Sequence, residues 1–176
     1  MFKATPLEAN RLFDYHPPQT RNRNNLAKRG QRMATLLVEA EPTPADIRFL
    51  QDKLHEYNVE QTGATDGKWL CIFVRDDNGE IAAGLHGWTW AGSAKIENLW
   101  VRRELRRQGY GTRLLEVAER EAAARGCDQL FLDTFSFQAP LFYQKLGYEI
   151  IGAVDGFPFP PHRHYHLRKR LGSPLR

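Results

Sequence analysis

The chain has 176 residues, of which 41% are hydrophobic and 26% charged, a composition that suits one globular domain with a core of its own. No stretch of 18 apolar residues occurs, which excludes a membrane-spanning helix. Two cysteines cannot form a disulfide framework. We therefore expect Cys71 and Cys127 to be buried free thiols in a reducing compartment, and we expect the protein to be cytoplasmic.

The formal net charge of +4 is concentrated at the N-terminus. Residues 1–32 hold seven basic and two acidic residues, a net charge of +5, which leaves −1 for residues 33–176. The first 32 residues are polar, contain Pro17 and Pro18, and lack an apolar signal region, so we expect a basic, disordered tail before a single domain. A leader upstream of Met33 and an arm that binds nucleic acid are alternative interpretations.

The domain begins with a predicted strand at 34–40, followed by a helix. Thr43, Pro44 and Asp46 form a helix-start pattern with a capping residue, a proline in the first turn and an acid three residues on. Ile47, Leu50, Leu54 and Tyr57 recur at helical spacing. Two strands follow at 69–75 and 80–90, joined by the turn sequence Asp-Asp-Asn-Gly at 76–79.

Strands and helices alternate in the second half of the chain. We predict strands at 95–102, 129–134, 148–154 and 163–169, and helices at 111–125 and 139–146, each ended by a glycine. The segment from Ile96 to Leu115 is the most informative, because a strand there leads through a loop with Gly109 and Gly111 into a helix. Backbone N–H groups converge at such a junction and the helix dipole favours an anion.

The loop therefore predicts a phosphate or pyrophosphate site. Four arginines, Arg102, Arg103, Arg106 and Arg107, add positive charge around it. Two nucleotide-binding motifs do not fit. A dinucleotide fingerprint requires a third glycine at position 114, which is leucine, and the Gly-Lys-Ser/Thr end of a P-loop is absent.

The segment Arg106-Arg107-Gln108-Gly109-Tyr110-Gly111 resembles Arg/Gln-x-x-Gly-x-Gly/Ala, the acyl-CoA pyrophosphate loop of the GNAT superfamily of N-acetyltransferases. A second block, residues 131–148, resembles the family's late strand followed by Ala-x-x-Phe/Leu-Tyr-x-Lys-x-Gly-Phe/Tyr. The resemblance runs over residues 34–171. It implies an α+β fold with a central mixed sheet of about seven strands flanked by helices, and one family helix absent or irregular near 59–68.

The resemblance also implies an activity: transfer of acetyl from acetyl-CoA, as co-substrate and without a metal, to a primary amine. The partners would be acetyl-CoA and an amine acceptor rather than a membrane or nucleic acid, and the protein a monomer or homodimer. The alternative is a catalytically weak acyl-CoA-binding module that acts through partner contacts. The implied cofactor-binding residues are Leu99, Trp100, Val101, Arg106, Arg107, Gln108, Gly109, Tyr110, Gly111, Thr112 and Ser136.

Two catalytic residues are implied. Tyr143 matches the family's general-acid tyrosine, which donates a proton to the CoA sulfur. Glu97 is the acid within the strand at 95–102, and strand alternation would place it on the same face as Leu99 and Val101. It is our candidate for the base, with Asp133 as a second candidate.

Three further features leave alternatives open. His162, His164 and His166 alternate and could bind a metal, although a solvated strand face is the simpler interpretation. Ser136 stands where many relatives carry an asparagine that contacts the cofactor. Six aromatic residues could line an acceptor pocket or simply pack: Trp88, Trp90, Trp100, Phe135, Phe157 and Phe159.

Overall fold

A computed structural model describes residues 36–172, in two compact units that divide after Gly63. The predicted tail, residues 1–32, lies outside the described residues. The first unit contains helix α1, Pro44–Thr62. Its predicted start is confirmed, because Thr43 and Asp46 form a reciprocal capping box and Pro44 occupies the first turn. The helix ends at Thr62 and is capped by Gly63, so the first part of the segment 59–68, where a family helix was expected to be absent or irregular, is helical and residues 63–67 are irregular.

The strand predicted at 34–40 is wrong for its described part. Residues 36–40 are irregular, and Leu36, Leu37 and Val38 are 96%, 78% and 100% exposed. An apolar run becomes a strand only where a neighbouring strand satisfies its backbone hydrogen bonds, and none of the six described strands pairs with this segment.

The second unit is a mixed sheet flanked by helices, which confirms the expected α+β class. Among the described residues it has six strands, where about seven were expected, in the order β1-β2-β3-β4-β6-β5. Of these six, only β3 and β4 form a parallel pair. The strands are β1 Lys68–Arg75, β2 Ile81–Trp90, β3 Ser93–Val101, β4 Gln129–Phe135, β5 Glu149–Asp155 and β6 Arg163–Arg170. The helices are η1 Arg103–Leu105, α2 Tyr110–Ala124 and α3 Pro140–Lys145.

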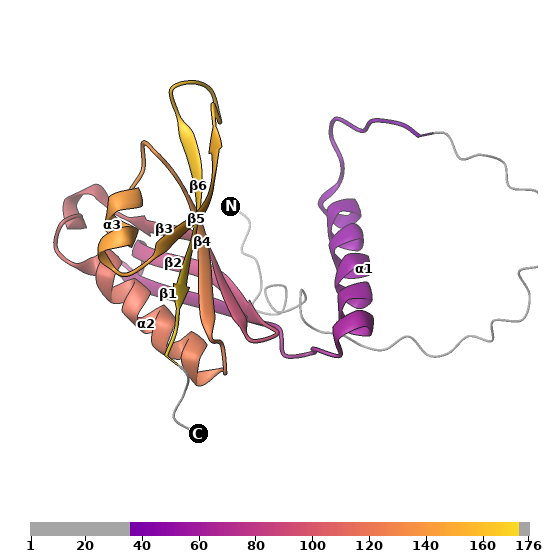
Figure 1. Cartoon of the computed structure of the whole chain (residues 1–176), viewed down its shortest axis with the longest axis horizontal. Helices are drawn as coiled ribbons and strands as arrows, with labels where there is room; N and C mark the ends of the chain where they lie inside the picture. The colour runs from indigo at the N-terminus through magenta and orange to yellow at the C-terminus, as the bar shows by residue number, and fades with distance from the viewer. Residues whose placement is uncertain (1–35, 173–176) are drawn as a thin grey trace, which may run out of the picture. The chain divides into compact units, whose positions relative to one another are not determined.

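Helices α2 and α3 lie on the same side of this sheet (Figure 1) and cover its core face. The buried side of α2 carries Leu114, Leu115, Ala118 and Ala122, at the helical spacing that the sequence predicts. These residues form one hydrophobic cluster with alternate residues of the strands, among them Leu85, Ala94, Leu130 and Leu132.

The other face of the sheet carries side chains that are half-buried or exposed within this unit. Cys71 lies on it and is exposed, so the prediction of two buried thiols holds only for Cys127. The reason is strand alternation, since the buried Leu70 precedes Cys71 on β1. Burial raises the pKa of the Cys127 thiol. Within residues 36–172, every helix is too short or too polar to cross a bilayer.

Strands β3 and β4 separate halfway along β3. They pair from Ser93 with Gln129 to Ile96 with Leu132, where their ladder ends, while β3 continues against β2 to Val101. A β-bulge marks the same point, because His86 pairs with Asn98 and Gly87 with Ile96, which leaves Glu97 as the extra residue. A Cβ at Gly87 would lie 2.1 Å from the Lys95 carbonyl oxygen, so only glycine allows this approach.

Candidate active site

The separation of β3 and β4 opens a cavity of about 990 Å³, here called the splay cavity, which β3, β4, α2 and α3 enclose. It brings together most of the residues predicted from the sequence. Those that line it are Glu97, Leu99, Trp100, Val101, Arg106, Arg107, Gly109, Tyr110, Gly111, Thr112 and Tyr143. The separation of the two strands also frees the backbone edge of β3 beyond Ile96.

One end of the splay cavity is formed by the N-terminus of α2, a helix of 15 residues. Gly109 caps the helix at φ 82°, and no side chain of the described residues makes a capping hydrogen bond there. Arg107 also has a positive φ, 61°, so the loop turns sharply before the helix. Backbone N–H groups of the first turn are thus available to an anion in the cavity.

Gly111 is required for a different reason, which is close packing. A Cβ there would lie 3.2 Å from Cζ of Phe142 on α3. The absence of a side chain therefore lets α2 begin against α3 and keeps the backbone at the cavity wall.

The four arginines of the loop do not all face the cavity. Arg106 and Arg107 line it, and the Arg106 Nε donates to the Val101 carbonyl over 3.1 Å. Arg102 instead donates from Nη1 to Asp76 over 2.8 Å, at the turn between β1 and β2. Arg103 is in the short helix η1 and is outside the lining.

Two predicted cofactor-binding residues lie outside the lining. The Gln108 side chain donates to the Glu104 carbonyl over 2.7 Å. The Ser136 hydroxyl accepts a hydrogen bond from the Arg163 backbone N–H over 3.1 Å and so ties β4 to the start of β6. Their contact with a cofactor stays a prediction.

Tyr143 lies in the first turn of α3, as the sequence motif indicates, and lines the splay cavity. It is 8% exposed and packs edge-on against Phe142 and Tyr148, with ring centroids 5.1 and 5.9 Å away. Burial raises the pKa of the phenol above its usual value, so Tyr143 keeps its proton at neutral pH and can donate a hydrogen bond into the cavity.

Glu97 lines the cavity but lies on a different face from the one predicted. Leu99 and Val101 pack against the core, whereas the Glu97 carboxylate accepts a hydrogen bond from the Trp88 indole over 3.0 Å and lies 3.8 Å from Lys95 Nζ. The bulge at Glu97 shifts the strand by one residue, which reverses the alternation that the sequence implies.

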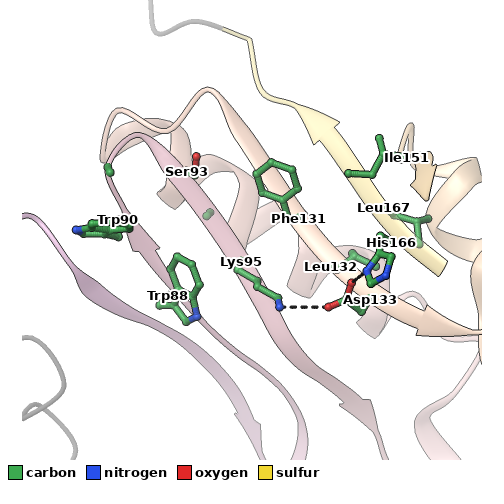
Figure 2. A pocket seen from close by; sticks show the side chains of 12 residues that line it. Trp88, Trp90, Ser93, Lys95, Phe131, Leu132, Asp133, Ile151, His166 and Leu167 are labelled. Carbon is green, nitrogen blue, oxygen red and sulfur yellow. Dashed lines mark hydrogen bonds and ion pairs between the residues drawn. The ribbon is translucent and has the colours of Figure 1, made fainter. Parts of the chain in front are cut away.

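A second cavity, of about 600 Å³, lies on the face of the sheet opposite α2 and is called here the tryptophan pocket. Figure 2 shows its polar centre: the Lys95 ammonium points at Asp133, and His166 lies on the other side of the same carboxylate. The distances are 3.2 Å from Lys95 Nζ to Asp133 Oδ2 and 2.6 Å from His166 Nδ1 to Oδ1. Trp88, Trp90 and Phe131 form apolar walls.

Asp133 lines both cavities. Partial burial raises the pKa of its carboxyl, but the hydrogen bonds from His166 and Lys95 outweigh that effect, and the pKa falls below its ordinary value. Asp133 is therefore ionised at neutral pH. Asp133 is predicted from the sequence as a second candidate base, and His166 as part of a histidine row. Their contact is not predictable from local patterns, because the β4–β6 register that pairs them joins residues 33 positions apart.

The remaining histidines join an aromatic cluster. The His164 ring lies 4.5 Å from Phe135 and 5.6 Å from Phe157, and the His162 ring lies 5.0 Å from Phe137. Among residues 36–172, no group of three or more His, Cys, Asp or Glu side chains is arranged to hold a metal ion. Trp88 and Trp90 line the tryptophan pocket, whereas Trp100 is in the splay cavity.

Comparisons with known proteins agree with this architecture. Residues 29–148 match the Acetyltransferase (GNAT) family. An acetyltransferase of Agrobacterium fabrum is 34% identical over 107 residues, which cover 61% of this chain and 78% of that protein. The blasticidin-S acetyltransferase of Streptomyces morookaense is 37% identical over 86 residues, 47% of this chain and 61% of that enzyme.

A solved structure gives the same result. The crystal structure of an acetyltransferase from Bacillus cereus superposes with a TM-score of 0.65 at 32% identity and covers 77% of this chain and 98% of its own. Three findings lead to one conclusion: a family match over most of the chain, a sheet that separates beside a helix N-terminus without a side-chain cap, and the relatives' shared activity. The chain belongs to the GNAT family of acetyltransferases.

Proposed function

We propose that this acetyltransferase moves acetyl from acetyl-CoA to a primary amine by direct transfer, with both substrates bound at once in and beside the splay cavity. One observation carries the proposal: a single cavity joins the free N-terminus of α2, the unpaired edge of β3 and the Tyr143 side chain. We assign the activity to residues 33–176, since the family match covers parts of both units.

The backbone would hold the cofactor end of the substrate. First-turn N–H groups of α2, with Arg106 and Arg107 beside them, suit a pyrophosphate. The edge of β3 at Leu99 and Val101 offers backbone groups to the pantetheine amides, and an N–H from this edge would polarise the thioester carbonyl. Arg106 already donates a hydrogen bond to the Val101 carbonyl, so at Val101 the backbone N–H is the group left for the cofactor.

The reaction needs one base and one proton donor. The amine nitrogen forms a bond to the thioester carbonyl carbon, the carbon–sulfur bond breaks, and the amine proton is taken up by Glu97 directly or through water. The partner of the leaving sulfur is Tyr143. Burial raises the pKa of this phenol, so Tyr143 is protonated at neutral pH and can donate a hydrogen bond to the developing thiolate. The sulfur takes the phenol proton as the carbon–sulfur bond breaks, and solvent then reprotonates the phenolate.

The proposal places the enzyme in the cytoplasm. An exposed free thiol such as Cys71 is compatible with a reducing compartment and would be prone to oxidation outside it.

A thiol-release assay tests the proposal. The protein is mixed with acetyl-CoA and with a panel of primary amines, and free CoA thiol is measured together with the mass of the acetylated amine. We expect amine-dependent thiol release that disappears in Gly109→Asp, which puts a side chain and a negative charge on the positive-φ cap of α2. Tight CoA binding without transfer to any amine would instead support the acyl-CoA-binding module.

A further inference from the structure

We propose that the tryptophan pocket is the acceptor site and that it selects a primary amine attached to a flat aromatic body, with Asp133 binding the ammonium. This inference rests on the proposed function and specifies its substrate class. The occupant is a small amine, and each feature of the pocket points to one part of it.

The polar centre of the pocket indicates a ligand with charge. A row of polar side chains crosses three strands, from Glu97 and Lys95 on β3 through Asp133 on β4 to the imidazole of His166 on β6. Charged side chains are costly to bury. Within the second unit, the side chains of this row are between 32% and 44% exposed, so they can meet water or a polar ligand in the cavity.

The charges of the side chains at the polar centre favour a cationic ligand. Glu97 and Asp133 supply two carboxylates, and Lys95 lies within 4 Å of both. The His166 imidazole, 2.6 Å from Asp133, carries a positive charge only when it is protonated, so beside a neutral imidazole one carboxylate is left to pair with a substrate ammonium. Asp133 is the better anchor, because the hydrogen bonds that lower its pKa keep it ionised and fixed in position. A carboxylate with a lowered pKa is a poor base, so Asp133 binds the amine and Glu97 remains the candidate for its proton.

The walls of the pocket favour an aromatic body. Trp88 and Trp90 come from β2 and Phe131 from β4, and all three line the cavity. Two of these rings are already fixed by hydrogen bonds, Trp88 to Glu97 and Trp90 to the Ala64 carbonyl over 3.0 Å. Rigid aromatic faces stack on flat ligands and attract cations at little entropic cost. The volume of about 600 Å³ accommodates a ring system with a short amine arm.

The position of the pocket fits transfer. Asp133 belongs to the lining of both cavities, so an amine held at Asp133 lies at the boundary shared with the splay cavity. Glu97 also reaches both, since it lines the splay cavity and accepts a hydrogen bond from Trp88 of the pocket. The amine and the thioester would therefore meet where β3 and β4 separate.

Direct binding tests the pocket without relying on turnover. Phenethylamine and tryptamine are titrated into CoA-saturated full-length protein, with n-butylamine as the aliphatic probe, and affinity is followed by calorimetry and tryptophan fluorescence. We expect the aryl amines to bind at least tenfold more tightly than butylamine. Equal affinities, or no binding of any amine, would overturn the proposal. Aryl amine binding without thiol release would support the pocket but contradict the proposed function.

Two matched pairs of variants locate the site. Trp88→Phe and Trp88→Leu both lose the hydrogen bond to Glu97, but only phenylalanine keeps an aromatic face, so the preference for aryl amines should persist in Trp88→Phe and vanish in Trp88→Leu. Asp133→Asn should weaken amine binding by about tenfold or more. Asp155→Asn, an acid on β5 outside both cavities, should bind amines normally. Equal losses in Asp133→Asn and Asp155→Asn would contradict the assignment.

Discussion

The splay cavity and the tryptophan pocket share Asp133 but are built on different principles. The splay cavity is lined mainly by one continuous stretch of chain, from Glu97 to Thr112, and its key groups are backbone N–H donors and glycines. The tryptophan pocket is assembled from side chains of β2, β3, β4, β5 and β6. A site made of backbone groups suits a ligand that is the same in every relative, such as the cofactor. A site made of side chains can change its acceptor through a few substitutions.

If the splay cavity depends on its backbone, one glycine substitution should disable it. In Gly111→Asp, the new Cβ would lie 3.2 Å from Phe142, and the carboxylate would repel a pyrophosphate at the start of α2. We expect CoA affinity measured by calorimetry to fall at least 100-fold. Amine binding in the tryptophan pocket should change much less, which would separate the two cavities.

A control variant should show how much stability a glycine-to-aspartate substitution costs away from the cavities. Unlike Gly111, Gly79 has a positive φ, 80°, so a side chain there is strained, but it lies in the β1–β2 turn with open space around it and outside both cavities. Gly79→Asp should therefore lose some stability and keep its CoA affinity. A variant Gly111→Asp that binds CoA as the wild type does would contradict the assignment of the pyrophosphate site.

The next effect in size concerns Tyr143, which touches the splay cavity through a side chain. Tyr143→Phe removes only the hydroxyl, so the ring contacts with Phe142 and Tyr148 and the CoA affinity should survive. Turnover should fall by about 10²–10⁴-fold, the usual size of a general-acid contribution. Unchanged turnover on a responsive amine would show that water protonates the thiolate.

The difference between the cavities also explains what the sequence could predict. The pyrophosphate loop was predictable because its glycines, arginines and helix start are neighbours in the chain, and eleven of the predicted site residues do line one cavity. Sequence analysis could name Trp88, Asp133 and His166 but not their meeting. That depends on the registers of β2 with β3 and of β4 with β6, which local patterns do not contain.

The other errors have local physical causes. The prediction that Glu97 shares a strand face with Leu99 and Val101 was wrong, because a bulge, permitted by Gly87, adds one residue to β3. Cys71 was expected in the core because its neighbours are apolar, but it faces away from the core beside the buried Leu70. The strand at 34–40 was inferred from an apolar run alone, and its described residues have no partner strand.

A third substitution should affect the scaffold and neither cavity. The Tyr148 hydroxyl donates to Glu119 over 3.0 Å, and Lys169 Nζ lies 2.6 Å from the other oxygen of Glu119. Tyr148→Phe removes one hydrogen bond to a charged group, so we expect a loss of about 1–2 kcal/mol in the free energy of unfolding. Denaturant unfolding measures this loss, and the affinities for CoA and amines should not change.

The same variant should alter the response to alkali. Burial, together with the charge and hydrogen bond of Glu119, raises the pKa of Tyr148 in the folded state. The unfolded chain then loses this proton first, so the stabilisation is complete below about pH 10 and is lost as the pH rises further. Stability of Tyr148→Phe should therefore decline less steeply above pH 10. Parallel profiles for the two proteins would show that Tyr148 does not control alkaline unfolding.

The smallest effect is expected at Asp76, which holds the start of the pyrophosphate loop from outside the cavity. Its carboxylate accepts hydrogen bonds from Arg102 over 2.8 Å and from the backbone N–H groups of Asn78 and Glu80, and the bond from Arg102 is the main reason why the pKa of Asp76 lies below its ordinary value. A lowered pKa means that the stabilisation is present when the pH is above the pKa of the unfolded state, about 3.9, and disappears as the pH falls through the pKa of the folded state.

Asp76→Asn should accordingly melt slightly below the wild type at pH 7, with a smaller shift than Tyr148→Phe. The melting temperatures of Asp76→Asn and the wild type should converge below about pH 4. Because Arg102 is outside the lining of the splay cavity, CoA affinity should be unchanged. A clear loss of CoA affinity in Asp76→Asn would show that the backbone site depends on this ion pair to position its loop, and the contrast between a backbone-built and a side-chain-built cavity would then apply less sharply.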